Sequence, residues 1–217
     1  MASPSDPPPE GTAKKVSHLV VLGHPSPDSF NAAIARAYIE RVQFRHQQAV
    51  LRDLYALGFD PLLKESERTA SDTTEVAEDA RRELELATKA DVLVFVYPLW
   101  FGAPPAIVKG YLDRVFGAAS RSKDFHNPGK SPFAGKRLAL ISTSGASLPW
   151  LEGQGVWVSL RQSFDQYLKA VVGFAQCDHY HADEIIDGLG PTHAARIFYE
   201  VAEFADQLCS ARAHRST

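Results

Sequence analysis

The chain has few cysteines, no long apolar run and almost no excess of either charge. Only Cys177 and Cys209 occur among 217 residues, which excludes a disulfide-rich scaffold. One disulfide is possible, but so few cysteines are more typical of a reducing compartment, and we expect a cytoplasmic protein. No run of about 18 uncharged apolar residues exists, so no membrane span is expected. The formal charge of −3 is scattered and gives no reason to expect a nucleic-acid partner.

The length of 217 residues fits a single domain with a large core better than two domains. The first 15 residues, MASPSDPPPEGTAKK, contain four prolines and lack the apolar middle of a secretory signal. We therefore expect a disordered N-terminal extension over 1–15, a single domain over 16–212 and a flexible tail over 213–217.

Apolar periodicity predicts alternating strands and helices. Strands are expected at 18–22, 49–54, 92–97, 137–142 and near 174–180, and helices at 30–45, 75–89, 106–116, 154–170 and 192–211. This alternation predicts an α/β fold with a parallel sheet covered by helices on both faces. Five strands fit the flavodoxin-like doubly wound order 2-1-3-4-5, in which the loops after strands one, three and four converge on one edge.

The first of these loops, 23–31, lacks the G-x-G-x-x-G pattern of dinucleotide sites but suits an anion. Ser26, Ser29 and Asn31 offer neutral donors, and the helix that starts near Ser29 offers free backbone N–H groups. The same residues would also serve as an ordinary N-cap turn.

The second loop, 97–105, follows the most apolar strand and carries aromatic residues outside any strand or helix period. Trp100 and Phe101 can form a wall for an aromatic ring system, and Gly102 lets a ligand approach the backbone. The alternative is an aromatic plug that covers the end of the sheet.

The third loop, 142–147, reads STSGAS. Small hydroxyl residues and a glycine after a buried strand favour close backbone approach by a ligand. A serine nucleophile is the competing interpretation, but the segment does not match G-x-S-x-G.

Together the three loops resemble the NAD(P)H:quinone oxidoreductase-like branch of the flavodoxin superfamily. The resemblance is carried by VLGHPSPDSFN (21–31), DLYALGFDP (53–61), PLWFGAPPAIVKGYLDRVF (98–116) and STSGA (142–146), and it extends over roughly 16–207. It implies a non-covalent flavin at the carboxyl edge of the sheet. The flavin is FMN or FAD, with FMN preferred because no extra segment for an adenylate half is evident.

By matching positions, the resemblance assigns three groups of cofactor-binding residues. These are His24, Ser26, Ser29, Phe30 and Asn31 at the phosphate end; Pro98, Leu99, Trp100, Phe101 and Gly102 along the ring; and Thr143, Ser144, Gly145 and Ala146 at its other edge. Some family members carry a Tyr and a His beyond the third loop that stabilise charge, whereas here Trp150 and Trp157 fall near those places. Trp150, and Phe125 or His126 of the polar loop 121–130, are candidate acceptor contacts, although that loop can equally be a surface excursion.

The resemblance further implies a homodimer that takes NADH or NADPH and reduces quinone-like or azo acceptors by two electrons, in a ping-pong exchange through one slot. A flavin-binding regulatory or ancillary subunit of a transporter or other partner is the main alternative, and a one-electron carrier is a third. No metal is predicted: Cys177, His179 and His181 alternate along a strand in a way that suits either a metal or the polar face of an edge strand.

Overall fold

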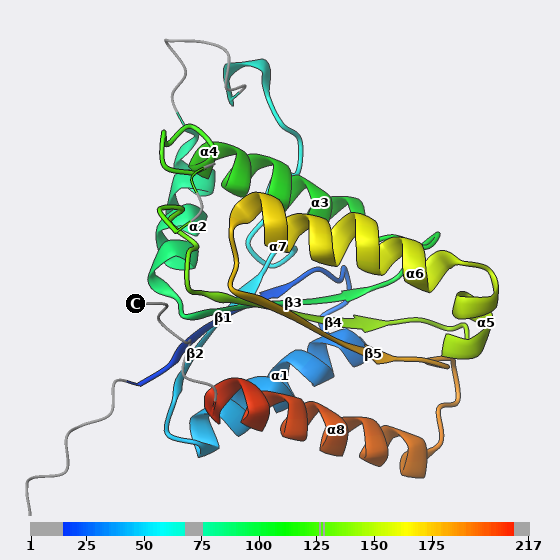
Figure 1. Ribbon diagram of the computed structural model, residues 1–217. Coiled ribbons are helices and arrows are strands. Elements are labelled where there is room, and N and C mark those ends of the chain that lie inside the picture. Colours follow the sequence, from blue (N-terminus) through cyan, green and yellow to red (C-terminus); the bar gives the residue numbers. More distant parts are fainter. Residues whose placement is uncertain (1–14, 68–75, 126, 128, 211–217) are drawn as a thin grey trace, which may run out of the picture.

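The computed structural model describes residues 15–67, 76–125, 127 and 129–210, which form a five-stranded parallel sheet between two layers of helices (Figure 1). The strands are β1 (Ser17–Leu22), β2 (Gln48–Asp53), β3 (Val92–Pro98), β4 (Arg137–Thr143) and β5 (Gln176–Ala182). Their order is β2-β1-β3-β4-β5 with all neighbouring pairs parallel, so the predicted fold and strand order are confirmed.

Helices α1 (Phe30–Phe44) and α8 (Pro191–Ser210) cover one face of the sheet (Figure 1). The other face carries α2 (Glu78–Lys89), α3 (Ala106–Tyr111), α4 (Gly117–Ala119), α6 (Val156–Leu160) and α7 (Tyr167–Val172), with α5 (Leu148–Gly153) at the end of the sheet. Successive β3 side chains enter opposite layers: Val94 packs with α1 and α8, whereas Leu93 and Phe95 pack in the other layer. Every residue of β3 and β4 is therefore buried.

The helices predicted over 106–116 and 154–170 are each divided by a π-helical turn. The turn η2 (Leu112–Phe116) links α3 to α4, and η3 (Arg161–Gln166) links α6 to α7. Apolar spacing cannot distinguish such turns from regular helix, but π turns are frequent at functional sites. The short helix α5 was not predicted, because six residues are too few to show a period.

Some predicted boundaries differ from those in the structure, and some predicted segments lie outside the described residues. The second helix begins at Glu78 rather than at residue 75, β5 ends at Ala182 rather than 180, and the last helix begins at Pro191. Apart from Lys15, the predicted extension over 1–15 lies outside the described residues, as do the tail over 213–217 and His126. No helix in the described part of the chain has the length and apolarity needed to cross a membrane.

An ion cluster around the buried Arg114 fastens the connection after β2 to the helical layer. Arg114 of η2 is almost fully buried, and its guanidinium binds Glu67 of the short 3-10 turn η1 (Glu65–Glu67) and Asp79 of α2. The Arg114 hydrogen bonds are the main influence that lowers the pKa of Asp79. Because each ion has a partner at 2.8 Å or less, this arginine is a structural anchor of the helical layer.

Candidate functional site

A groove of about 400 Å³ lies at the carboxyl edge of the sheet, where the loops after β1, β3, β4 and β5 meet. It is lined by His24, Ser26, Ser29, Phe30, Asn31, Pro98, Leu99, Trp100, Thr143, Ser144, Gly145, Ile185, Ile186, Asp187 and Leu189. All the predicted cofactor-binding residues except Phe101, Gly102 and Ala146 are in this set. We call it the rim groove.

The first loop forms the N-cap turn, which is one of the two roles that its sequence left open. Ser29 caps α1, since its Oγ accepts a hydrogen bond from Ala32 N at 3.2 Å. The amides of Phe30 and Asn31 precede the first intrahelical hydrogen bond and so point out of the helix end. His24 Nδ1 accepts from Ser26 N at 3.0 Å, which holds the loop beside that end. The result is a polar, electropositive end of the rim groove.

The first and third loops are joined by a buried side-chain pair. Asn31 Nδ2 donates to Thr143 Oγ1 at 2.9 Å, and both residues are almost inaccessible to solvent. The second loop is fixed to the third as well, because Leu99 N donates to Thr143 O at 2.7 Å. Thr143 therefore sets the relative position of all three loops.

The second loop folds into a tight turn at Trp100. Trp100 and Ala103 exchange backbone hydrogen bonds of 3.0 and 3.1 Å, and the central residues Phe101 and Gly102 have φ of 52° and 77°. Positive φ at both central positions is the geometry of a type I′ turn, which glycine tolerates and phenylalanine does not favour. Strain of this kind concentrates at binding sites. The turn presents the Trp100 ring, 43% exposed, to the rim groove, 5.8 Å from the His24 ring.

The remaining predicted residues lie around the rim groove rather than in its lining. Phe101 is fully exposed and, with Gly102, lines a neighbouring groove of about 490 Å³ beside Val156. Trp150 lies exposed on α5. Ala146 is outside the lining, and its carbonyl accepts a hydrogen bond from Ser144 Oγ at 2.7 Å. Because Ser144 gives its hydrogen to this carbonyl, the pair of Ser144 and His181 is not arranged as a nucleophile and its base.

The loop after β5 completes the rim groove and was missed by sequence reasoning. It contributes Ile185, Ile186 and Asp187, and Ile185 N donates to Ser144 O at 2.8 Å. The predicted strand order could have indicated this loop, because β5 lies next to β4 in that order and the carboxyl end of β5 must reach the same edge.

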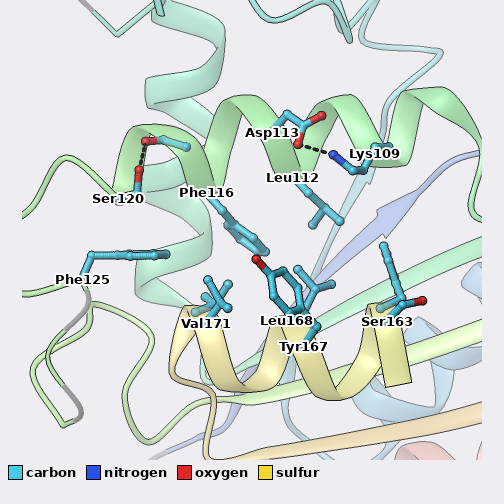
Figure 2. A pocket seen from close by; sticks show the side chains of 13 residues that line it. Lys109, Leu112, Asp113, Phe116, Ser120, Phe125, Ser163, Tyr167, Leu168 and Val171 are labelled. Atoms are coloured by element: carbon cyan, nitrogen blue, oxygen red, sulfur yellow. Dashed lines mark hydrogen bonds and ion pairs between the residues drawn. The ribbon is translucent and has the colours of Figure 1, made fainter. Parts of the chain in front are cut away.

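Phe125 lies in a different place from the rim groove. It is buried at one end of an apolar groove of about 560 Å³ between η2 and α7, which Figure 2 shows with Leu112, Phe116, Leu168 and Val171 along its walls. The ion pair of Lys109 and Asp113 lies at its edge. Although this groove is larger, it lacks the converging donors of the rim groove, and convergent polar groups distinguish a cofactor site.

The alternating residues of β5 are those whose sequence suited either a metal or the polar face of an edge strand. Among the residues that the structure describes, no group of three or more His, Cys, Asp or Glu side chains is arranged to hold a metal ion. Burial raises the pKa of the Cys177 thiol to about 12, so the thiol is neutral. His179 and His181 instead make hydrogen bonds to serines of β4 and its loop.

Comparison with known proteins identifies the fold family. Residues 17–207 match the family described as having the flavodoxin-like fold. The chain belongs to the flavodoxin-like fold family. Within it, an uncharacterized NAD(P)H oxidoreductase of Haemophilus influenzae is 32% identical over 146 residues, which cover 67% of this chain and 72% of the relative.

NAD(P)H dehydrogenase (quinone) 1 of Cavia porcellus is 31% identical over 147 residues, or 59% of this chain and 53% of the relative. The chain thus spans about half the length of that second relative. Among solved structures of this fold, the NAD(P)H:quinone oxidoreductase from Methanothermobacter marburgensis has a TM-score of 0.76 at 22% identity, covering 89% of this chain and 97% of that chain. An FMN-dependent NADH-azoreductase from Bacillus anthracis, solved with FMN, has a TM-score of 0.68 at 17% identity, covering 90% and 100%.

Proposed function

We propose that the chain is a flavin-dependent NAD(P)H oxidoreductase that reduces quinone-like or azo acceptors by two electrons. One observation carries the proposal: the N-terminus of α1, the Trp100 turn and the segment from Thr143 to Gly145 line a single groove at the carboxyl edge. The named activities of the relatives, which are NAD(P)H oxidoreductases and quinone dehydrogenases, support the same reaction class.

The residues present fit an FMN. The N-terminus of α1, with the hydroxyls of Ser26 and Ser29, matches a phosphate, since helix N-termini bind anions through free amides and the helix dipole. The Trp100 side chain and the backbone of Pro98 and Leu99 match a flat ring. Thr143, Ser144 and Gly145 provide polar groups for its far edge. FMN is proposed rather than FAD because the sequence shows no evident extra segment for an adenylate half.

A flavin held there would supply the hydride chemistry between NADH or NADPH and the acceptor, in two half-reactions that use the same binding site. The protein's own contribution is to hold the cofactor in a fixed position. The Asn31–Thr143 pair fixes the loops, the amides of α1 orient the phosphate, and Trp100 excludes water from one side of the ring.

A homodimer is part of the proposal. Large apolar side chains are exposed on the second loop and along α5, α6 and α7, namely Phe101, Trp150, Val158 and Tyr167. Exposed apolar groups that gather in one region mark an interaction surface. Size-exclusion chromatography with light scattering tests this, and a mass of one 23.8 kDa chain across micromolar concentrations contradicts it.

Steady-state kinetics test the function. The protein is saturated with FMN, freed from excess, and assayed for NAD(P)H oxidation at several concentrations of menadione. The proposal predicts a yellow protein and parallel double-reciprocal lines, as in ping-pong exchange. Intersecting lines contradict the single slot, and a colourless protein contradicts the flavin site. A yellow protein without turnover contradicts the enzyme and favours an ancillary subunit.

A further inference from the structure

A continuous chain of hydrogen bonds runs from the buried Asp165 of η3 to the rim groove. Asp165 Oδ2 lies 2.8 Å from His179 Nδ1, and His179 Nε2 lies 2.7 Å from Ser142 Oγ. Ser142 Oγ lies 2.8 Å from His181 Nδ1, and His181 Nε2 lies 3.0 Å from Ser144 Oγ. The chain ends where Ser144 Oγ donates to Ala146 O at 2.7 Å. Ser144 lines the rim groove, whereas Asp165 and the His179 side chain are fully buried.

The number of protons in this chain follows from its contacts. Five contacts need five protons, one in each. The two serines bring one proton each and two neutral imidazoles bring one each, so an ionised Asp165 leaves the chain one proton short. With Asp165 ionised, all five bonds form together only when one imidazole carries a second proton. The hydrogen-bond geometry alone does not distinguish the two imidazoles as the site of the fifth proton, because Ser142 can donate to one while it accepts from the other.

The Asp165 carboxylate can offset one extra proton in the chain, whereas burial makes a second extra proton on His181 unfavourable. Burial, followed by the charge of His179, lowers the pKa of His181 to about 4, while Asp183 opposes this. The Asp165 carboxylate contacts His179 directly and is also paired with Arg161 at 3.2 Å. The side chain of Trp157 covers both imidazoles, with ring centroids at 4.9 and 5.0 Å. The other ionisable groups near Asp165 are Tyr97 and Cys177, and burial keeps both of them neutral.

We propose that Asp165, His179, Ser142, His181 and Ser144 form a proton relay that delivers one proton to the ligand reduced in the rim groove. This rests on the proposed function. The overall reaction, NAD(P)H + H⁺ + quinone → NAD(P)⁺ + hydroquinone, consumes one proton, while both electrons come from the nicotinamide.

The relay step is balanced within the chain. Ser144 Oγ–H breaks as the proton passes to an oxygen or nitrogen of the reduced ligand, and Ser144 Oγ takes the Nε2 proton of His181. His181 Nδ1 holds the proton that it shared with Ser142, and Ser142 donates to His179 Nε2. Both imidazoles then remain neutral, with His179 Nδ1–H still bonded to Asp165. Water reprotonates His181, which is only partly buried.

The proton count is tested on flavin-free protein, independently of the proposed function. Nitrogen-15 NMR of the histidine side chains at pH 7 reports which ring nitrogens carry hydrogen. The relay predicts one doubly protonated imidazole whose signal disappears in His179→Gln or His181→Gln. Two neutral imidazoles at these positions overturn the proposal.

The transfer is tested by breaking the chain at Ser142, which is outside the lining of the rim groove. In FMN-loaded Ser142→Ala we expect unchanged flavin affinity and roughly a hundredfold slower menadione reduction, as for the loss of a general acid. The difference in rate between wild type and Ser142→Ala should become smaller as the pH falls, because protons from solvent then replace those of the relay. Ser131→Ala is the matched control, since Ser131 is also a buried serine, donates to Val172 O at 2.6 Å and is outside the lining of the rim groove.

The outcomes separate the two proposals. Ser142→Ala with wild-type turnover and an unchanged pH profile overturns the relay and leaves the flavin enzyme intact. Equal slowing in Ser131→Ala also overturns it, because a general loss of packing then explains the effect. If wild-type protein binds no flavin, the proposed function fails, and the NMR proton count alone decides whether the relay exists.

Discussion

Asn31 at the start of α1 and Thr143 at the end of β4 are joined by a buried hydrogen bond of 2.9 Å, although 112 positions separate them in the chain. Each side chain would be costly to bury alone, because an unpaired buried polar group loses its hydration without compensation. Together they hold two loops of the rim groove at a fixed separation. The site is therefore formed before any ligand arrives, which reduces the entropy lost on binding.

Thr143→Val should leave the Asn31 amide unpaired and lower the free energy of unfolding by about 1–3 kcal/mol. Asn31→Ala should cost a similar amount. The double variant should be less destabilised than the sum, with a coupling of about 1 kcal/mol measured by urea unfolding. Additive losses would show that the hydrogen bond contributes nothing.

Trp100→Ala should weaken FMN binding by about tenfold or more, because covering the ring with a large aromatic side chain contributes about 2 kcal/mol. Fluorescence titration of FMN measures the change. Phe44→Ala is the control, since Phe44 is an exposed aromatic at the opposite end of α1. Equal FMN affinity of wild type and Trp100→Ala would remove Trp100 from the site.

Two helical glycines should respond in opposite directions to alanine. A Cβ at Gly110 of α3 would lie 2.2 Å from Pro61 O and 2.5 Å from Pro61 Cα, so the backbone must move. Gly110→Ala should therefore destabilise the protein by about 1–3 kcal/mol. A Cβ at Gly117 of α4 meets nothing within 4 Å, and Gly117→Ala should stabilise it by about 0.5–1 kcal/mol. Thermal unfolding measures the midpoint temperature of each variant relative to wild type. A change in the same direction for both variants contradicts this account.

His18 should make the protein less stable in mild acid. It is buried on β1, with Nδ1 2.8 Å from Tyr38 Oη, and burial lowers its pKa from 6.5 to about 4. Between these values the unfolded chain binds a proton that the folded chain does not, so stability is full above pH 6.5 and falls as the pH drops towards 4. The loss approaches about 3 kcal/mol.

Urea unfolding at pH 7.5 and pH 5 measures this loss. His18→Gln keeps a polar partner for Tyr38 and should show a smaller difference between the two pH values. The part that remains in the variant includes His181, whose pKa is lowered to about 4 as well. An identical pH dependence in wild type and variant would exclude His18 as a source.

The sequence predicts the fold well because its strongest signals are local. The apolar runs of β1, β3 and β4 identify buried parallel strands, and the strand order then brings three loops to one edge. Short or non-periodic features escape this reasoning. Helix α5 is too short to show a period, the π turns preserve apolar spacing, and the contribution of Asp187 depends on the path of the chain after β5.

The histidine–serine chain illustrates the limit most clearly. Alternation alone places His179 and His181 on one face of β5, without telling whether that face meets a metal, solvent or other side chains. The register pairs Ser142 with His181, and this pairing puts one hydroxyl between two imidazoles. Asp165 joins them from a π turn of another layer, which no local pattern predicts.

Titration of flavin-free protein with FMN and with riboflavin, followed by flavin fluorescence, tests the central claim most directly. If a flavin lies in the rim groove with its phosphate at the N-terminus of α1, FMN binds once per chain and at least about tenfold more tightly than riboflavin, a difference of about 1.4 kcal/mol. Equal affinities, or no binding of either compound, would contradict the site.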